Sequence, residues 1–224
     1  NRYIAEFTYA YINTHGNALN TWNDAYNAIL RANNVINSTL PVTAVSSQLR
    51  GEALTLRALM YFSLVKLYAK PFTADPNAEG VPLVLQFDPT IKPARAKVSE
   101  VYKQKEKDLN DAFGLMTNTA KNSSLISKFV AKALLSRVYL YKGDWNNAKT
   151  AALDVVNNGG YSLVSDANFT NYWKSPSPVA NKVETIFEIS ADGINNNGTN
   201  ALAYFYDPAG YGDAICADDL YNKY

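Results

Sequence analysis

Aromatic and amide side chains gather in two stretches of the chain, residues 2–20 and 195–212. The second stretch reads NNNGTNALAYFYDPAGYG and carries one charged residue, Asp207. Flat aromatic faces can stack on the apolar C–H faces of pyranose rings, and amides can exchange hydrogen bonds with sugar hydroxyls. The sequence therefore predicts binding of a hydroxyl-rich ligand. The residues that we expect to contact it are Tyr11, Asn13, Asn17, Trp22, Asn200, Tyr204 and Tyr206.

Two aromatic assignments stay open at the level of sequence. Trp22 stands at an expected helix start, where packing against a neighbouring helix is favoured over contact with a ligand. Residues 168–178, NFTNYWKSPSP, form a third and weaker candidate loop. It is weaker because Tyr172 and Trp173 can equally well close the end of a helical stack.

The residues offer little for catalysis. His15 is the single histidine, it lies in the polar stretch THGNALN, and no GxSxG motif accompanies it, so an exposed loop histidine is the default interpretation. A glycosidase needs two carboxylates that face one cleft. Composition alone supplies the acidic candidates, which are Glu184, Asp192, Asp207, Asp213 and Asp218. We therefore expect no catalytic residue, no metal site and no cofactor.

The composition excludes further classes of protein. The chain has 21 Lys and Arg against 20 Asp and Glu, so its net charge of +1 creates no overall field that would attract nucleic acid or an anionic membrane. Cys216 is the single cysteine, which excludes an intrachain disulfide and a multi-cysteine zinc site. No apolar stretch approaches the roughly 20 residues that a membrane-spanning helix needs.

Hydrophobic periodicity predicts the elements that must position the candidate residues. Thr21 to Asp24 fits a capping box, so a helix should begin there and end near Asn37 or Pro41. Residues 49–69 carry two apolar stripes, which predict a helix buried on two sides. One stripe contains Leu49, Ala53, Leu56, Met60, Leu64 and Leu67, and the other contains Leu54, Ala58, Tyr61, Val65 and Tyr68.

Residues 70–97 contain repeated prolines and predict an excursion without helix, with a short extended piece at 81–85. Further helices are expected from about Ser99, from about Ser127 and over residues 145–157. Between the last two, Lys142-Gly143-Asp144 predicts a tight corner in which Gly143 takes positive φ and Asp144 caps the next helix. That last helix should pack through Trp145, Ala148, Ala152 and Val156.

A weak internal repeat supports a helical array. Shifted by 80 positions, Ala53, Leu54, Arg57 and Tyr61 fall on Ala133, Leu134, Arg137 and Tyr141. The stretch YLYKGDWNNAKTAALDVV is typical of the corner of a tetratricopeptide repeat. For Arg57 and Arg137, an ion pair or hydrogen bond between helices is favoured over an anion site. The predicted fold class is mainly α, a tetratricopeptide-like helical array with long irregular loops and a little β structure.

The order of these segments resembles SusD/RagB-like proteins. The resemblance runs from WNDAYNAILRANNVI through GEALTLRALMYFSLVKLYAKPF, GVPLVL and ARAKVSEVYKQKEKDLNDAF to KFVAKALLSRVYLYKGDWNNAKTAALDVVNNGGYSL and VETIFEIS. It covers nearly the whole chain. It implies a fragment of one SusD-like domain over 1–224. Its tetratricopeptide-like part covers 21–158 and contains the excursion 70–97, and residues 159–224 are the loop-rich start of the C-terminal part.

The resemblance also implies a function. SusD-like proteins are surface-exposed outer-membrane lipoproteins of Bacteroidetes that capture glycans, or peptides in RagB-like members, and deliver them to a SusC-like TonB-dependent transporter. This chain departs from the pattern because it lacks a lipid-bearing N-terminal cysteine and stops earlier than family members usually do. We therefore expect it to be a truncated piece whose ligand site is shared with further sequence.

Two rival functions remain from the sequence. A helical adaptor would bind a protein or peptide through exposed aromatic and amide residues on its helices, whereas the aromatics here fall at positions expected to pack. A glycan-degrading enzyme would need paired carboxylates about 5–9 Å apart. The non-catalytic glycan-binding interpretation is the one that the residues and the resemblance share.

Overall fold

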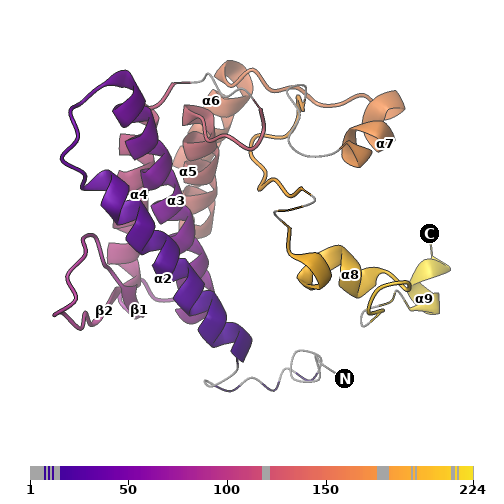
Figure 1. Cartoon of the computed structure of the whole chain (residues 1–224), viewed down its shortest axis with the longest axis horizontal. Coiled ribbons are helices and arrows are strands. Elements are labelled where there is room, and N and C mark those ends of the chain that lie inside the picture. The colour runs from indigo at the N-terminus through magenta and orange to yellow at the C-terminus, as the bar shows by residue number, and fades with distance from the viewer. Residues whose placement is uncertain are drawn as a thin grey trace. The chain divides into compact units, whose positions relative to one another are not determined.

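A bundle of helices forms the core of residues 20–188, which make up one of the two compact units of the chain; the other comprises residues 1–19 and 189–224. The computed structural model describes residues 8, 10, 12, 16–117, 122–175, 182–192, 194, 196–212, 215 and 217–223. Figure 1 shows the bundle helices, which are α2 Gly16–Ile36, α3 Ala44–Tyr68, α4 Val98–Leu115, α5 Lys128–Lys142 and α6 Trp145–Asn158.

Packing in the bundle follows the order of the chain, because α3 packs against α4, α4 against α5 and α5 against α6. The apolar faces of α2, α3, α4 and α5 meet in one core, which also includes Val81 of the segment between α3 and α4. Its largest fully buried apolar side chains are Ile29, Tyr61, Leu64, Val81, Val98, Val101, Leu109 and Val138. The prediction of a mainly α fold with irregular segments and little β structure is confirmed.

The start of α2 differs from the predicted capping box. The helix begins at Gly16, so Thr21 and Asp24 lie inside it. Residues 16–20 contain no proline, and Ala18 and Leu19 favour helix, so nothing stops the chain from extending the helix by more than one turn. The predicted end near Asn37 is confirmed, because α2 ends at Ile36.

Helix α3 begins at Ala44, earlier than the predicted position 49. Thr43 caps it: its Oγ1 accepts a hydrogen bond from the Ser46 backbone N–H, and the Ser46 hydroxyl accepts one from the Thr43 N–H. Of the two predicted apolar stripes, the one with Leu54, Ala58, Tyr61 and Val65 is buried. The other stripe is only partly buried, since Leu49, Leu56 and Leu67 are exposed.

The corner between α5 and α6 is confirmed in detail, whereas the packing face of α6 is not. Gly143 has φ +80°, and the Asp144 carboxylate accepts a hydrogen bond from the Asn147 N–H. The buried residues of α6 are Ala148, Ala151 and Val155, and the predicted packing residues Trp145, Ala152 and Val156 are exposed. Both sets fit a 3.6-residue period, so the periodicity could not choose between them.

The excursion between α3 and α4 forms a small antiparallel sheet, in place of any helix, as predicted. Strand β1, Glu79–Pro82, pairs with β2, Arg95–Lys97, with Glu79 opposite Lys97. The extended piece was expected at 81–85, and the strand itself lies two to three residues earlier. Residues 83–85 continue past the strand and are held by side chains of α2 and α3, as described below.

The chain after α6 contains short helices and extended segments. Helix α7, Asp166–Lys174, replaces the predicted loop, because Asp166 in its first turn and Lys174 in its last turn both complement the helix dipole. Residues 182–192 form neither helix nor strand. The Ser162 N–H donates to the Val183 carbonyl, and the Glu188 N–H donates to the Ser123 carbonyl.

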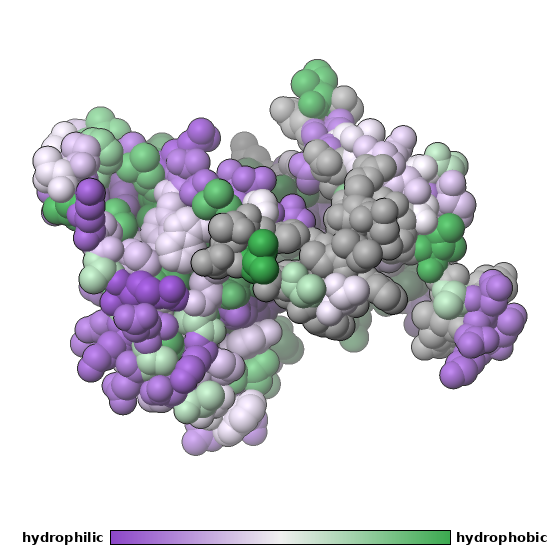
Figure 2. Space-filling model, turned by 90° about the horizontal axis from the view of Figure 1, so that it is seen from below, coloured by the Kyte–Doolittle hydropathy of each residue, from purple (hydrophilic) through white to green (hydrophobic). Residues whose placement is uncertain are grey.

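Residues 196–223 add the 3-10 helix η1 Gly198–Asn200, the helix α8 Leu202–Tyr206 and the helix α9 Asp218–Tyr221. Asp218 begins α9, where a carboxylate complements the helix dipole. Among the described helices, none combines the length and the apolar character that crossing a membrane requires. On the face drawn in Figure 2, hydrophobic residues form separate spots among hydrophilic ones. The exposed apolar side chains on that face therefore do not form one continuous hydrophobic surface.

Candidate functional site

Tyr204 and Tyr206 lie on α8, in a stretch whose sequence has no helical periodicity. The turn after α8 folds back on it: Gly210 N–H donates to the Asp207 carbonyl, and Tyr211 N–H donates to the Tyr204 carbonyl over 2.9 Å. The Tyr211 ring stands edge-on to that of Tyr204, with centroids 4.9 Å apart and planes at 83°. The stretch is therefore a short helix with a turn that folds back on it, and the two hold the tyrosines near the surface.

Gly210 makes this local fold possible. A Cβ at position 210 would lie 2.5 Å from the Tyr204 carbonyl oxygen, closer than atoms in contact can approach. Asp207 supports the same turn, because its carboxylate accepts a hydrogen bond from the Ala209 N–H over 2.9 Å. The glycine and the aspartate in DPAG thus shape the turn, and the tyrosines around them remain available.

Exposure distinguishes the two predicted tyrosines. Tyr206 is 58% exposed and Tyr204 is 38% exposed. A partly exposed ring with a free edge offers a flat apolar face and a hydroxyl, which are the two contacts that a sugar needs. Because Tyr211 holds the Tyr204 ring, that side chain has little rotamer freedom left to lose when a ligand binds.

The remaining predicted site residues are distributed over the chain. Asn200 ends η1, shortly before α8, and so joins Tyr204 and Tyr206 in one local stretch. Asn17 is exposed in the first turn of α2. Tyr11 and Asn13 lie outside the described residues, as does His15. Ligand contact through these residues stays a prediction.

Trp22 is half-buried and packs among other rings. Its centroid lies 5.0 Å from that of Tyr26 and 5.0 Å from that of Tyr68, the latter edge-on. The Tyr26 hydroxyl donates to the Pro82 carbonyl over 2.8 Å, and burial, the first cause, raises the pKa of Tyr26 far above its usual value of 10.0. These contacts favour the packing interpretation of Trp22, which the sequence had already preferred.

Helix α7 presents aromatic side chains that the sequence ranked lower. The Tyr172 hydroxyl accepts hydrogen bonds from the Glu184 and Thr185 N–H groups over 3.1 and 2.8 Å, which ties the helix to residues 182–192. Phe169 and Trp173 are 53% and 56% exposed, with ring centroids 6.2 Å apart. Tyr172 alone therefore performs the packing role expected of this segment. The aromatic pair spaced by four residues in NFTNYW was the signal for a second exposed aromatic surface.

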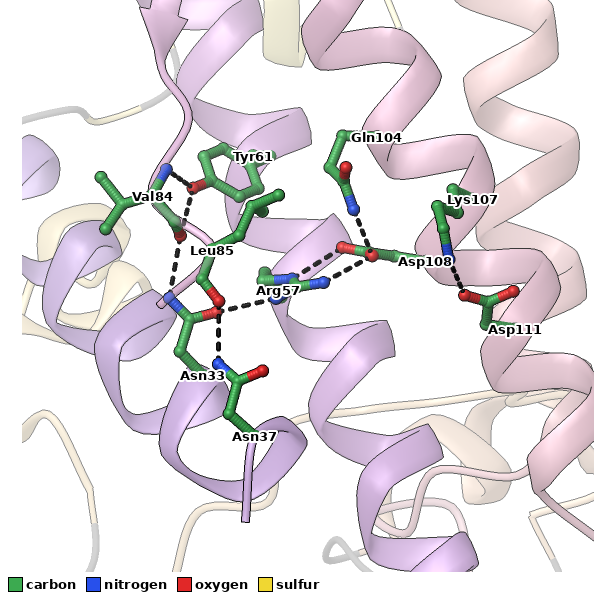
Figure 3. Close-up of polar contacts among 10 residues, drawn as sticks. All are labelled: Asn33, Asn37, Arg57, Tyr61, Val84, Leu85, Gln104, Lys107, Asp108 and Asp111. Atoms are coloured by element: carbon green, nitrogen blue, oxygen red, sulfur yellow. Dashed lines mark hydrogen bonds and ion pairs between the residues drawn. The ribbon is translucent and has the colours of Figure 1, made fainter. Parts of the chain in front are cut away.

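Arg57 lies at the centre of a buried polar network (Figure 3). Its Nε and Nη2 donate to the two carboxylate oxygens of Asp108 over 2.8 and 2.7 Å, and its Nη1 donates to Asn33 Oδ1 over 2.8 Å. Gln104 also donates to Asp108, over 2.8 Å. The interpretation of Arg57 as an interhelical ion pair is confirmed. Arg137 is exposed and has no ion pair in the part of the chain that the structure describes, so the same interpretation is wrong for Arg137.

The same network holds the extended residues after β1 (Figure 3). Asn33 Nδ2 donates to the Val84 carbonyl over 2.8 Å, and Asn37 Nδ2 donates to the Leu85 carbonyl over 2.9 Å. The Tyr61 hydroxyl accepts from the Val84 N–H and donates to its carbonyl, over 2.7 and 2.9 Å. Burial, the largest cause, raises the pKa of Tyr61 to about 12, so the hydroxyl stays protonated. These polar groups are structural.

Two cavities open on the helical unit. A cavity of about 580 Å³ lies beside the Arg57 network, and its charged lining includes both Asp108, paired with Arg57, and Asp111, whose carboxylate pairs with Lys107 over 2.5 Å. Within each pair the two charges neutralise one another, and Arg50 is a further cation in the lining. The second cavity, of about 310 Å³, lies at the C-terminal end of α3 and is lined by lysines and aromatic rings. Within the described residues, no group of three or more His, Cys, Asp and Glu could hold a metal ion.

Comparison with known proteins gives one consistent result. A SusD-like family model described as starch-binding associating with outer membrane matches residues 2–140. A SusD-like protein of Bacteroides ovatus is 26% identical over 211 residues, which cover 87% of this chain and 34% of that protein.

Solved structures agree with the sequence relatives. A SusD superfamily protein of Bacteroides thetaiotaomicron superposes with a TM-score of 0.76 at 29% identity, covering 90% of this chain and 46% of that one. A laminarin binding SusD-like protein superposes with a TM-score of 0.59 at 29% identity, covering 73% of this chain and 36% of that one. The chain thus spans about half the length of the first of these structures, and about a third of the second and of the Bacteroides ovatus protein.

Proposed function

Because this chain belongs to the SusD-like family, whose model matches more than half of its residues, we propose that it is a non-catalytic glycan-binding protein. In this proposal it works at the outer surface of the outer membrane, where a lipid anchor on the full-length precursor holds it. It captures an oligosaccharide and passes it to a SusC-like transporter. No bond of the glycan is broken by this chain.

The exposed tyrosines of α8 carry the proposal. Tyr206 is the more exposed of the pair, and the turn around Gly210 fixes both residues on one short segment. Stacking on a ring that is already held in place costs little ordering, and it is tolerant of which sugar is bound. The starch-binding description of the family and the laminarin binding relative support the same class of ligand.

A glycan array or affinity gel tests this function on the full-length protein. We expect Tyr206→Ala to weaken binding of a neutral polysaccharide by about 2- to 10-fold, which is the contribution of one aromatic contact. Tyr204→Ala should weaken it by a similar factor, and thermal unfolding should change little for either variant because both side chains are partly exposed.

Trp145→Ala is the matched control, since Trp145 is a 66% exposed aromatic residue on α6. Its binding should equal that of the unmodified protein. Unchanged binding in both tyrosine variants would remove α8 from the site. Absence of polysaccharide binding together with binding of peptides would replace the glycan proposal by the peptide-binding, RagB-like alternative.

One observation favours a second function, that of a protein-interaction scaffold. Some aromatic and apolar residues of α6 do not pack in the interior. Trp145 and Val156, which were expected to be buried, are 66% and 68% exposed. A scaffold that docks a peptide here should lose peptide binding in the double variant Trp145→Ala, Val156→Ser. Glycan binding should be retained by the same variant. The reverse pattern would reject the scaffold.

A further inference from the structure

The cavity of about 310 Å³ lies between the C-terminal end of α3, the residues that follow it, and the helices α4 and α5. Phe72, Tyr102 and Tyr141 give it aromatic walls, and Lys66 and Lys70 give it charge. Its volume is at the small end of the range of ligand sites, about 300–1,000 Å³, and so suits a ligand the size of one sugar ring.

Both lining lysines are exposed and lack a counterion within the described residues, and no carboxylate lines the cavity. Lys66 Nζ lies 4.6 Å from the Phe62 ring centroid and 5.4 Å from that of Tyr141. The nearby carboxylate of Glu106 is taken by Lys142, whose Nζ is 2.7 Å away. The cavity is therefore electropositive.

A third lysine lies behind the wall of the cavity. Lys105 is completely buried, and its Nζ has no hydrogen-bond partner among the described residues. The Nζ lies 3.3 Å from the centroid of Tyr102, whose ring lines the cavity, and 4.3 Å from that of Phe62. A buried amine without a carboxylate partner is costly to keep in a folded protein unless something compensates its charge.

We propose that this cavity binds a single sugar ring that bears an oxyanion, either a carboxylate or a sulfate ester. The sugar ring lies against Phe72 and Tyr141, and the oxyanion lies beside Lys66 and Lys70. That the ligand is a sugar rests on the proposed function, whereas its anionic group is inferred from the charge of the lining lysines. None of the described residues that line the cavity belongs to α8.

Binding at this cavity should take up a proton. Burial, the largest cause, and the charge of Lys66 lower the pKa of Lys105 to about 6, and Glu106 opposes this shift. An anion in the cavity favours the charged amine and raises this pKa, so affinity is greater at pH 6 than at pH 8. The other charged and titratable groups near Lys105 are Lys66, Glu106, which pairs with Lys142, and Tyr102. Burial, the largest cause, raises the pKa of Tyr102 to about 12.

Isothermal titration with methyl glucuronide, glucose 6-sulfate, methyl glucoside and inorganic sulfate tests the proposal on the full chain. Either anionic sugar should bind at least about tenfold more tightly than the neutral glucoside. Lys66→Gln should weaken that binding by about tenfold, and Lys105→Met should remove its dependence on pH. Lys103→Gln, an exposed lysine on the same helix α4 that does not line the cavity, is the matched control and should change nothing.

Each result decides a separate point. A stronger response to glucuronide or to the sulfated sugar identifies which oxyanion the site takes. Equal binding of the neutral glucoside, an unchanged Lys66→Gln, or inorganic sulfate binding as tightly as both sugars would overturn the proposal. Neutral polysaccharide binding that is sensitive to Tyr206→Ala but not to Lys66→Gln would leave the proposed function intact while this inference fails.

Discussion

The tyrosines of the helical bundle and those of residues 198–212 are held in different ways. Tyr61 is completely buried, and its hydroxyl is satisfied by Val84, a residue 23 positions away. Tyr204 is held by Tyr211 and by the turn around Gly210, all within a few residues, and remains partly exposed. The long-range contacts of Tyr61 therefore bury its ring and stabilise the fold. The local contacts of Tyr204 restrict its ring but leave part of it accessible to a ligand. Substitutions should accordingly affect folding in the first region and binding in the second.

The largest effect on folding should come from breaking the Arg57–Asp108 pair. Asp108→Ala leaves a buried guanidinium without its partner and should lower the free energy of unfolding by about 3–5 kcal/mol in urea denaturation. Lys107→Ala breaks the exposed pair with Asp111, which lies on the same helix, and should cost less than about 1 kcal/mol. Equal losses in the two variants would contradict the distinction between the buried and exposed pairs.

The pH dependence of stability should report Lys105. Its pKa is lowered from 10.5 to about 6 in the folded state, so the unfolded chain binds more protons between these values. Stability must then rise as pH increases through this window, by about 1 kcal/mol per pH unit. Lys105→Met should show a flatter profile from pH 7 to 9, and should be no less stable at pH 7. Parallel profiles of the variant and the unmodified protein would show that Lys105 keeps its charge when buried.

A smaller effect should follow from removing one hydroxyl. Tyr61→Phe removes the acceptor of the Val84 N–H, whereas the Val84 carbonyl keeps its hydrogen bond from Asn33. The free energy of unfolding should fall by about 1 kcal/mol. Tyr206→Phe, the same change at a 58% exposed residue, should leave stability unaltered. Stability measurements that rank the two variants in the opposite order would contradict the comparison between the regions.

The smallest effect on binding should come from Gly210→Ala, a substitution confined to the second region. The new Cβ would meet the Tyr204 carbonyl oxygen, so the turn must shift and move the tyrosines. Glycan affinity should fall by about 2- to 5-fold, while the free energy of unfolding changes by less than about 1 kcal/mol. Gly114→Ala is the matched control, because a Cβ there meets nothing within 4 Å, and it should leave binding unchanged.

Much of the helical bundle could be predicted from the sequence because its signals are local. Gly143 and Asp144 determine the corner between α5 and α6 by backbone conformation and capping, and proline excludes helix from most of residues 70–97. The face of α6 could not be predicted, because the stripe with Ala148 and the stripe with Trp145 have the same period. Only contact with α5 determines which stripe is buried.

The candidate site was predicted less completely. The composition of residues 195–212 pointed to Tyr204 and Tyr206, but helix α8 and the turn that fixes its rings depend on contacts such as the one between Gly210 and Tyr204. On α7, sequence could not separate Tyr172, which is tied down by its hydroxyl, from Trp173, which is exposed. Adjacent residues of similar chemistry take opposite roles because they point to different sides of one helix.

The sequence by itself determined the family, the helical class and the enrichment in tyrosine, since these follow from segment order, periodicity and composition. Tertiary structure alone decided which aromatic side chains are buried in the core. It also placed Lys66, Lys70 and Lys105 around one aromatic cavity, although Lys105 is more than 30 positions from the others in the chain. The physical reason is that burial and electrostatic neighbours are properties of packed helices, and no local pattern encodes which side chain meets another.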